Sequence, residues 1–251
     1  MSSARERLIP MVERLARLAP LGGGDREALL ALPHTVRTMP VAGHLVRDGE
    51  PPESCALLLT GFAFRHKITG DGARQIISIH IAGEFVDLQN VFLDVSDHNV
   101  QMLTESEVAF IPRAAVRDLA MSNPAVGRAL WMQTLIDASI FREWVVNVGR
   151  RDSRTRVAHL LCEFSLRLQA AGLASGHRYE LPMTQEQLAD ATGLTAVHVN
   201  RVLKRMEAEG LIERDRRFIR IPNWDGLRSA GGFSELYLHL DQMPRPESAV
   251  A

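Results

Sequence analysis

The spacing of apolar residues changes twice along the chain. A helix ending before Pro20 is predicted near the amino terminus by apolar residues at helical spacing, namely Leu8, Met11, Val12, Leu15 and Leu18. From about residue 36 to residue 111 the pattern becomes a series of short β-rich runs with Gly or Asp between them. Several short strands in so small a region predict a sandwich or barrel. We therefore expect an α+β chain.

A long helix is predicted from Asn123-Pro124 to about Arg150, because proline is tolerated in the first turn of a helix. Steps of three and four residues separate a set of mostly apolar positions along it: Trp131, Thr134, Ala138, Phe141, Val145 and Val148. This heptad spacing favours a seam between two copies of the helix. The alternative is a helix that lies on the core of its own domain.

Two further helices are predicted in "TQEQLADATGLTAVHVNRVLKRMEAEGLIERD", residues 184–215. Thr184 and Gln187 have the spacing of a capping box, so the first helix has a defined start. Gly193 supplies the turn, and Thr195 caps the second helix. A basic helix that follows such a turn is typical of the helix-turn-helix that enters the major groove of DNA.

The second of these helices has two distinct sides. Val199, Val202 and Leu203 are expected to face inward, judged by 3.6-residue geometry. The outer side is predicted to carry Ala196, Val197, His198, Asn200, Arg201, Lys204 and Arg205. After Gly210, "LIERDRRFIRI" alternates about a polar turn, which predicts a two-stranded wing. The alternative interpretation is a helical hairpin with a solvated basic face.

Charge is distributed unevenly. The chain has 251 residues, 46% of them hydrophobic, and a net charge of −1. The segment Arg151–Pro222 nevertheless holds 12 Lys+Arg and 9 Asp+Glu, so a local basic face is available to neutralise phosphates. No apolar run approaches the ~18 residues of a membrane helix, and we expect a cytoplasmic protein without a membrane partner. Cys55 and Cys162 are far apart and are expected to be buried thiols.

Three stretches of the chain resemble the Crp/Fnr family of bacterial transcription regulators. "CALLLTGFAFRHKITGDGARQIISIHIAGEFVDL" resembles the β-roll sensor, "NPAVGRALWMQTLIDASIFREWVVNVGRRDSRTRVAHLL" the dimerisation helix and hinge, and "MTQEQLADATGLTAVHVNRVLKRMEAEGLI" the winged helix-turn-helix. The resemblance covers nearly the whole chain. It implies a β-roll (double-stranded β-helix) sensor domain at 1–122, a dimerisation helix and hinge at 123–151, and a winged helix-turn-helix domain with a carboxy-terminal extension at 152–251.

The resemblance also implies partners and contact residues. We expect a homodimer that binds double-stranded DNA at a palindromic promoter site, and RNA polymerase as a partner if the protein is an activator. The expected phosphate or base contacts are Thr184, Thr195, Ala196, Val197, His198, Asn200, Arg201, Lys204 and Arg205. Many family members have a Glu where this chain has Val197, whereas Arg201 matches the final Arg of the family motif. Because a carboxylate accepts from cytosine and Val cannot, the usual half-site is not expected; Val197 and Ala196 suit thymine methyl groups instead.

The sensor region departs from the members that bind cyclic AMP. Asp87-Leu88 stands where Gly-Glu is expected, and His98-Asn99 stands where Arg-Ser is expected, so the phosphate clamp is missing. A cyclic-nucleotide-responsive regulator stays as an alternative. A pocket for an unidentified small-molecule effector, if one exists, is predicted at Asp87, Asn90, His98, Asn99 and Thr134.

A cupin-like metal-dependent enzyme is the competing class. Such sites need two closely spaced histidines with a Glu and a third His, whereas "SIHIAGE" offers only His80 and Glu84. The other histidines of the β-rich region, His34, His44, His66 and His98, are scattered. We expect no catalytic residues, no metal and no cofactor. A protein-interaction module with a basic face is a third possibility.

Overall fold

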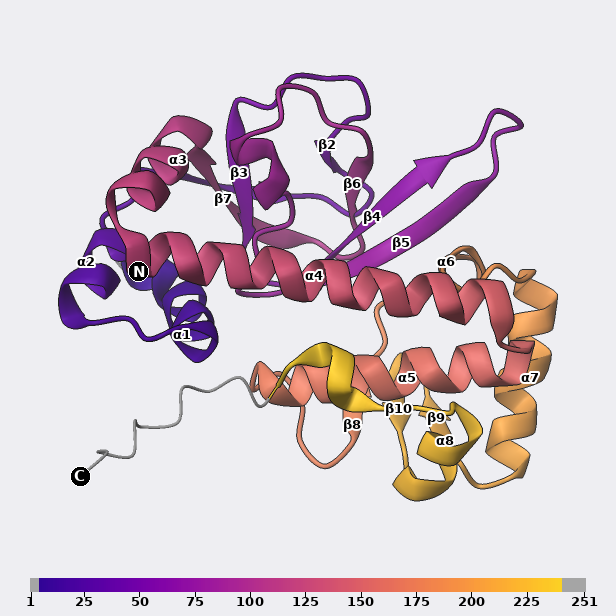
Figure 1. Cartoon of the computed structure of the whole chain (residues 1–251). Coiled ribbons are helices and arrows are strands. Elements are labelled where there is room, and N and C mark those ends of the chain that lie inside the picture. The colour runs from indigo at the N-terminus through magenta and orange to yellow at the C-terminus, as the bar shows by residue number, and fades with distance from the viewer. Residues whose placement is uncertain (1–4, 241–251) are drawn as a thin grey trace, which may run out of the picture. The chain divides into compact units, whose positions relative to one another are not determined.

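The computed structural model describes residues 5–240, which form two compact units (Figure 1). The first is built mainly from the chain up to Arg65 and from Ile79–Ala138. The second is built from His66–Ser78 and Ser139–Leu238. Each unit has its own buried core.

Helices at both ends of the first unit cover one side of its strands. They are η1 (Glu6–Leu8), α1 (Ile9–Leu18), α2 (Gly23–Leu30) and α3 (Arg113–Ser122). The predicted amino-terminal helix is confirmed, because Met11, Val12 and Leu15 of α1 are buried. They pack in one cluster with Leu57 and Ile111 from the strands.

Seven strands form the β-rich part in two sheets, which agrees with the predicted β-roll. The strands are β1 (Thr35–Met39), β2 (His44–Val46), β3 (Ser54–Leu58), β4 (Phe62–Ile68), β5 (Arg74–Ile81), β6 (Asn99–Met102) and β7 (Ser106–Pro112). One sheet has the order β1-β7-β3 and the other β2-β6-β4-β5. A second cluster of buried residues, including Leu58, Val86 and Val108, lies between strands. The short helix η2 (Leu88–Val91) precedes β6.

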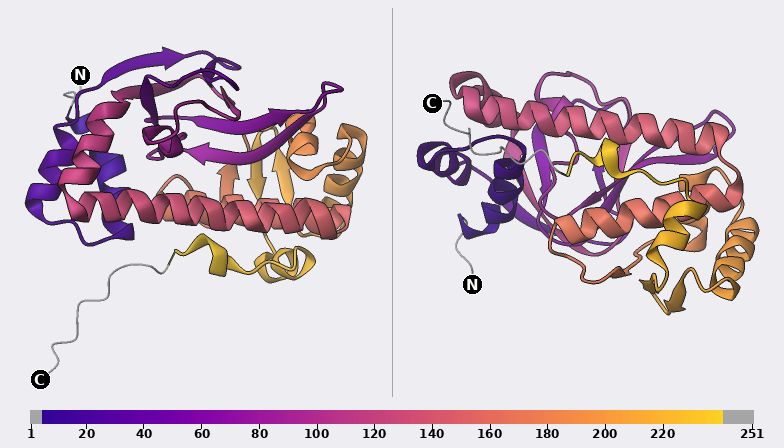
Figure 2. Two further views of the ribbon diagram at one scale, coloured as in Figure 1. Left: turned by 45° about the horizontal axis from the view of Figure 1, so that its top comes forward. Right: turned by 60° about the horizontal axis from the view of Figure 1, so that its bottom comes forward.

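Helix α4 (Pro124–Arg150) is unbroken, as both views of Figure 2 show, and it matches the predicted long helix. One face is buried through Val126, Ala129, Gln133, Ile140 and Trp144, among others. The opposite face is exposed. The helix therefore packs on the chain's own cores and still leaves an apolar stripe uncovered.

The second unit contains a three-helix group, a small sheet and a carboxy-terminal segment. Its elements after α4 are α5 (Ser153–Ala170), β8 (Arg178–Glu180), α6 (Gln185–Thr192), α7 (Ala196–Ala208), β9 (Glu213–Asp215), β10 (Phe218–Arg220), α8 (Trp224–Ala230) and η3 (Glu235–Leu238). The sheet has the order β8-β10-β9, all antiparallel. The sequence pattern predicted only the two-stranded wing, β9 and β10. It missed β8 because that strand is three residues long and pairs with a segment far along the chain.

A buried polar network ties the carboxy-terminal segment to α5. The Glu163 carboxylate accepts from Trp144 Nε1 at 3.1 and 3.0 Å, from Tyr237 Oη at 2.8 Å and from Arg167 Nη1 at 3.3 Å. His159 Nε2 lies 3.0 Å from the same Tyr237 oxygen, and burial lowers the pKa of His159 to about 4.

At Gly231 the carboxy-terminal segment also comes close to the backbone of α5. A side-chain carbon there would lie 2.8 Å from the His159 amide nitrogen, so only glycine fits without a shift. Residues 231–238 are therefore an integral part of the second unit.

The apolar residues of the carboxy-terminal segment differ in their exposure. Phe233 and Leu238 are buried, at 6% and 3% exposure, and Leu240 is at the margin with 38%. Leu236 is 79% exposed. The turn of η3 directs Tyr237 and Leu238 toward the unit, whereas the Leu236 side chain stays exposed.

The two cysteines, Cys55 and Cys162, are free thiols and are buried, as expected. Among residues 5–240, no helix has the length and apolar character needed to cross a membrane.

Candidate functional site

The α6–α7 pair has the start, turn and cap that the sequence predicts for a helix-turn-helix. Thr184 Oγ1 accepts from the Gln187 amide at 3.2 Å, and Gln187 Oε1 accepts from the Thr184 amide at 2.8 Å. Gly193 has a φ of 63°, the left-handed conformation that glycine adopts most easily. Arg156 of α5 holds the turn by donating to Thr192 O at 2.9 Å. The turn is therefore fixed by local residues and by the helix before it.

Helix α7 buries one side and exposes the other. Val199, Val202 and Leu203 are 0%, 6% and 2% exposed, which confirms that they face inward. Thr195 caps the helix by accepting from the His198 amide at 3.3 Å. None of the seven residues predicted on the outer side is buried, and Val197 is 70% exposed.

Some predicted DNA-contact residues make hydrogen bonds within the chain. His198 Nε2 lies 2.9 Å from Ser153 Oγ, and Asn200 Nδ2 donates to Gln185 Oε1 at 3.1 Å. These bonds orient both side chains on the surface of the unit. Ala196 is half-buried, and Thr184 and Thr195 are exposed cap residues.

The basic residues of α7 fall into two groups. Arg205 donates to Glu209 Oε1 at 2.8 Å, and Arg154 also donates to this carboxylate. These bonds lower the pKa of Glu209, so it stays ionised and competes with phosphate for Arg205. Arg201 and Lys204 are exposed and form no hydrogen bond or ion pair with any residue from 5 to 240. They are the cations of α7 that are available to a polyanion.

The wing carries two further basic residues that the sequence reasoning did not single out. Arg216 and Arg217 lie exposed between β9 and β10, and Arg216 has a φ of 54°. Positive φ values of non-glycine residues mark tight turns. The repeated arginines in "RDRRF" were the available signal.

The exposed stripe of α4 contains most of the predicted seam. Trp131, Phe141 and Val145 are 63%, 42% and 56% exposed. Ala138 is exposed as well, whereas Thr134 and Val148 are half-buried. The structure adds Leu135 and Val146, which are 46% and 45% exposed. So many large apolar side chains on one helix are unusual for a surface that stays in contact with water.

The predicted effector residues of the first unit are not all in one place. Asp87 lines a cavity, and Asn90 Nδ2 lies 3.5 Å from Asp87 Oδ2. His98 contacts Gln89 and Asp97 instead. Asn99 Oδ1 accepts from the Asp48 amide at 3.2 Å, and Thr134 Oγ1 donates to Leu130 O within α4. Asp87 and Asn90 therefore belong to one group, and the other three side chains have separate local roles.

Sequence reasoning missed the guanidinium of Arg65 in this region. Arg65 lies on β4 and is half-buried; it donates to Val86 O at 2.6 Å and to Gln89 Oε1 at 3.4 Å. A charged residue directly after the apolar run "FAF" of a predicted strand was the signal.

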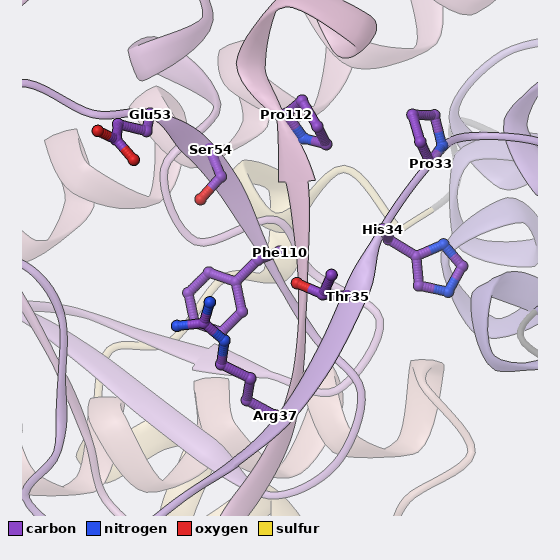
Figure 3. A pocket seen from close by; sticks show the side chains of 8 residues that line it. All are labelled: Pro33, His34, Thr35, Arg37, Glu53, Ser54, Phe110 and Pro112. Carbon is purple, nitrogen blue, oxygen red and sulfur yellow. The ribbon is translucent and has the colours of Figure 1, made fainter.

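A shallow groove of about 540 Å³ lies along one face of the sheet β1-β7-β3 (Figure 3). Arg37 lies over the Phe110 ring, with its guanidinium carbon 5.1 Å from the ring centroid. Glu53 and Ser54 line the side formed by β3. Within residues 5–240, no group of three or more His, Cys, Asp or Glu is arranged to hold a metal ion.

Two models of known domains match this chain. The Crp-like helix-turn-helix domain matches residues 155–230, and the cyclic nucleotide-binding domain matches residues 39–123. The first match covers α5 to α8 and ends just before the segment that carries Tyr237. The second covers the strands from β2 to β7.

Curated relatives and solved structures agree with these matches. The chain is 28% identical over 196 residues to a probable transcriptional activator of Rhizobium leguminosarum, covering 77% of this chain and 80% of the relative. It is 28% identical to the transcriptional activator protein FnrL of Cereibacter sphaeroides, covering 67% and 68%. The structure of FixK2 from Bradyrhizobium japonicum has the same fold, with a TM-score of 0.73, 24% identity, and coverage of 79% of this chain and 98% of that one.

Proposed function

Because the chain belongs to the Crp/Fnr family of DNA-binding transcription regulators, we propose that it acts as a homodimer whose two α7 helices enter successive major grooves of a palindromic promoter site. A single observation carries this proposal. Arg201 and Lys204 extend from the exposed side of α7 with no partner among residues 5–240. Exposed guanidinium and ammonium groups on the second helix of a helix-turn-helix suit contact with base edges and phosphates.

Arg201 is the proposed base contact. It follows Val197 by four residues, so the two share one face of α7. A guanidinium in the major groove donates two hydrogen bonds to guanine O6 and N7. Lys204 and Thr184, and Arg205 once released from Glu209, are proposed as phosphate contacts, with Thr195, His198 and Asn200 in supporting contacts to bases or phosphates.

Val197 and Ala196 are proposed to set a half-site that differs from the usual one of the family. The Val197 side chain is 70% exposed and has no group that forms hydrogen bonds. An apolar side chain at this position favours the methyl group of thymine over cytosine N4.

The exposed stripe of α4 is the proposed dimer interface. Trp131, Leu135, Phe141 and Val145 recur at steps of four, six and four residues, which keeps them on one side of the helix. Ala138 lies between them, and Thr134 and Val148 border the stripe. Pairing of two such helices around a two-fold axis would place the recognition helices on one face of the duplex, ~34 Å apart.

We do not expect cyclic AMP to be the effector. The positions that hold the cyclic phosphate in cyclic AMP-binding members are occupied by His98 and Asn99, whose side chains contact Gln89 and Asp48. We propose that the protein works in the cytoplasm, where DNA and RNA polymerase are found, and that RNA polymerase is a partner if the protein activates transcription.

Binding to a site selected from random DNA tests the role of Arg201. Arg201→Ala should weaken specific binding by ~1–3 kcal/mol and relax the preference at one base position. The matched control is Arg117→Ala, which removes one exposed arginine from α3. Unchanged affinity and unchanged preference in the Arg201 variant would contradict the assignment.

Sedimentation of a charged variant tests the interface. Phe141→Asp should give a monomer with little specific binding, because a buried unpaired carboxylate in the seam is strongly unfavourable. Val41→Asp, at a residue that is 61% exposed in the first unit, is the control and should stay dimeric. A Phe141 variant that remains dimeric would rule out this seam.

A further inference from the structure

A second cavity in the first unit, of about 370 Å³, lies beneath the segment that joins β2 to β3. Val46, Asp87 and Ser96 line it and are themselves buried, at 8%, 1% and 2% exposure. Pro51 and Pro52 contribute apolar surface. The cavity is within the size range of sites for small molecules.

The Asp87 carboxyl lining this cavity is short of hydrogen-bond donors. Its Oδ1 accepts from the Ala56 amide at 2.9 Å. For Oδ2, no donor among residues 5–240 comes closer than Asn90 Nδ2 at 3.5 Å, the outer limit of a hydrogen bond. An ionised carboxylate has about four acceptor sites, and buried polar groups normally have partners. The Asp87 carboxylate can therefore accept a further hydrogen bond, at Oδ2, from a ligand in the cavity.

Arg65, the nearby half-buried cation, does not fill this role. Its guanidinium donates to Val86 O and to Gln89 Oε1 rather than to Asp87. It acts on Asp87 only at longer range, where it lowers the pKa of Asp87 without overcoming the larger effect of burial, which raises it.

The charge around the opening is predominantly negative. Glu50 and Glu53 line the cavity together with Asp87, and Arg47 is the single cation in the lining. No ion pair joins Glu50, Glu53 or Arg47 to any residue from 5 to 240. Excess negative charge attracts cations to the opening and disfavours anions.

We propose that this cavity binds a small organic cation, an ammonium or guanidinium group on a short apolar chain, with Asp87 as the counter-ion. The N–H groups would donate to Asp87 Oδ2 and Ser96 Oγ, and the apolar chain would lie against Val46 and the two prolines. The charge of this ligand is opposite to that of a cyclic nucleotide. The inference does not depend on DNA binding, so its test is carried out without DNA.

Titration calorimetry of the full-length protein with butylguanidinium tests the proposal. We expect saturable binding of one cation per chain and at least 10-fold weaker binding by Asp87→Asn, which keeps an acceptor for the Ala56 amide but loses the charge. Ser96→Ala should weaken binding two- to three-fold. Butanoate, with a similar chain and the opposite charge, should not bind.

Two controls distinguish the site from a general charge effect. Glu105→Gln removes one exposed carboxylate that does not line the cavity, and it should bind the cation like the unmodified protein. Glu53→Gln at the rim should weaken binding two- to three-fold; it keeps the proposal testable if the Asp87 variant does not fold. The absence of saturable binding at millimolar cation, equal binding of butanoate, or full binding by both the Asp87 and the Glu53 variants would each overturn the proposal.

Discussion

Glu163 in the second unit and Asp87 in the first are buried carboxyl groups that are surrounded in opposite ways. Glu163 in the second unit receives hydrogen bonds from Trp144, Tyr237 and Arg167, and all four side chains are at least half-buried. Asp87 in the first unit has one short hydrogen bond, from the Ala56 amide, and lines a cavity. Both are 1% exposed, so the difference is in their partners and not in their burial.

The comparison separates a structural role from a functional one. A buried carboxylate with several donors fixes the elements that supply them, and here it joins α4, α5 and the carboxy-terminal segment. A buried carboxyl with few donors costs stability unless a ligand supplies the missing ones. The number of hydrogen-bond donors around a buried carboxyl group therefore says more about the role of that group than its exposed fraction does.

The largest effect is expected from Glu163→Leu. This change removes the carboxylate that accepts from the Trp144 indole, the Tyr237 hydroxyl and the Arg167 guanidinium. It should lower the free energy of unfolding of the second unit by ~3–5 kcal/mol, as when one partner of a buried ion pair is removed. Urea unfolding followed by tryptophan fluorescence measures it, with Glu186→Leu on the exposed side of α6 as control. A loss below ~1 kcal/mol in the Glu163 variant would show that the network does not stabilise the unit.

The second-largest effect is the pH dependence that Asp87 gives to the free energy of unfolding. Burial raises the pKa of this carboxyl to about 7, against 3.8 for a free aspartate. Between these values the folded state holds a proton that the unfolded state has lost, so stability falls as pH rises from about 4 to about 7. At ~1.36 kcal/mol per pKa unit, the fall amounts to ~4 kcal/mol.

Asp87→Asn removes this dependence. The variant should match the unmodified protein near pH 4 and exceed its stability at pH 8, by up to ~4 kcal/mol. Urea unfolding at the two pH values measures the difference, and Glu105→Gln should leave the pH dependence unchanged. Equal stability of the Asp87 variant and the unmodified protein at pH 8 would mean that this carboxyl is well solvated or well paired in solution.

Local signals explain how much of the architecture the sequence could predict. The capping box at Thr184, the turn at Gly193 and the inward face of α7 depend on residues within four positions of one another, and all are found in the structure. The long helix α4 follows from an equally local pattern. The DNA-contact and dimer residues remain predictions, because exposure alone does not identify a partner.

Long-range contacts explain what the sequence could not predict. Arg205 is a plausible phosphate contact by position, yet it hydrogen-bonds Glu209, which Arg154 also binds from 55 residues away. The predicted effector residues are dispersed for the same reason: Asn99 contacts Asp48, 51 residues earlier in the chain. Such pairs depend on the folded arrangement of strands and helices, and nothing in a single sequence marks them.

The smallest effect is expected from the tyrosines, which offer a matched pair because the chain has only two. Tyr237 Oη donates to the Glu163 carboxylate at 2.8 Å, whereas Tyr179 Oη donates to the Leu161 carbonyl at 2.9 Å. A hydrogen bond to a charged acceptor contributes ~1.5–3 kcal/mol and one to a neutral acceptor ~0.5–1.5 kcal/mol. Tyr237→Phe should therefore destabilise the second unit more than Tyr179→Phe does in the same urea titration. The reverse order would mean that Glu163 is protonated and that Tyr237 donates to His159 instead.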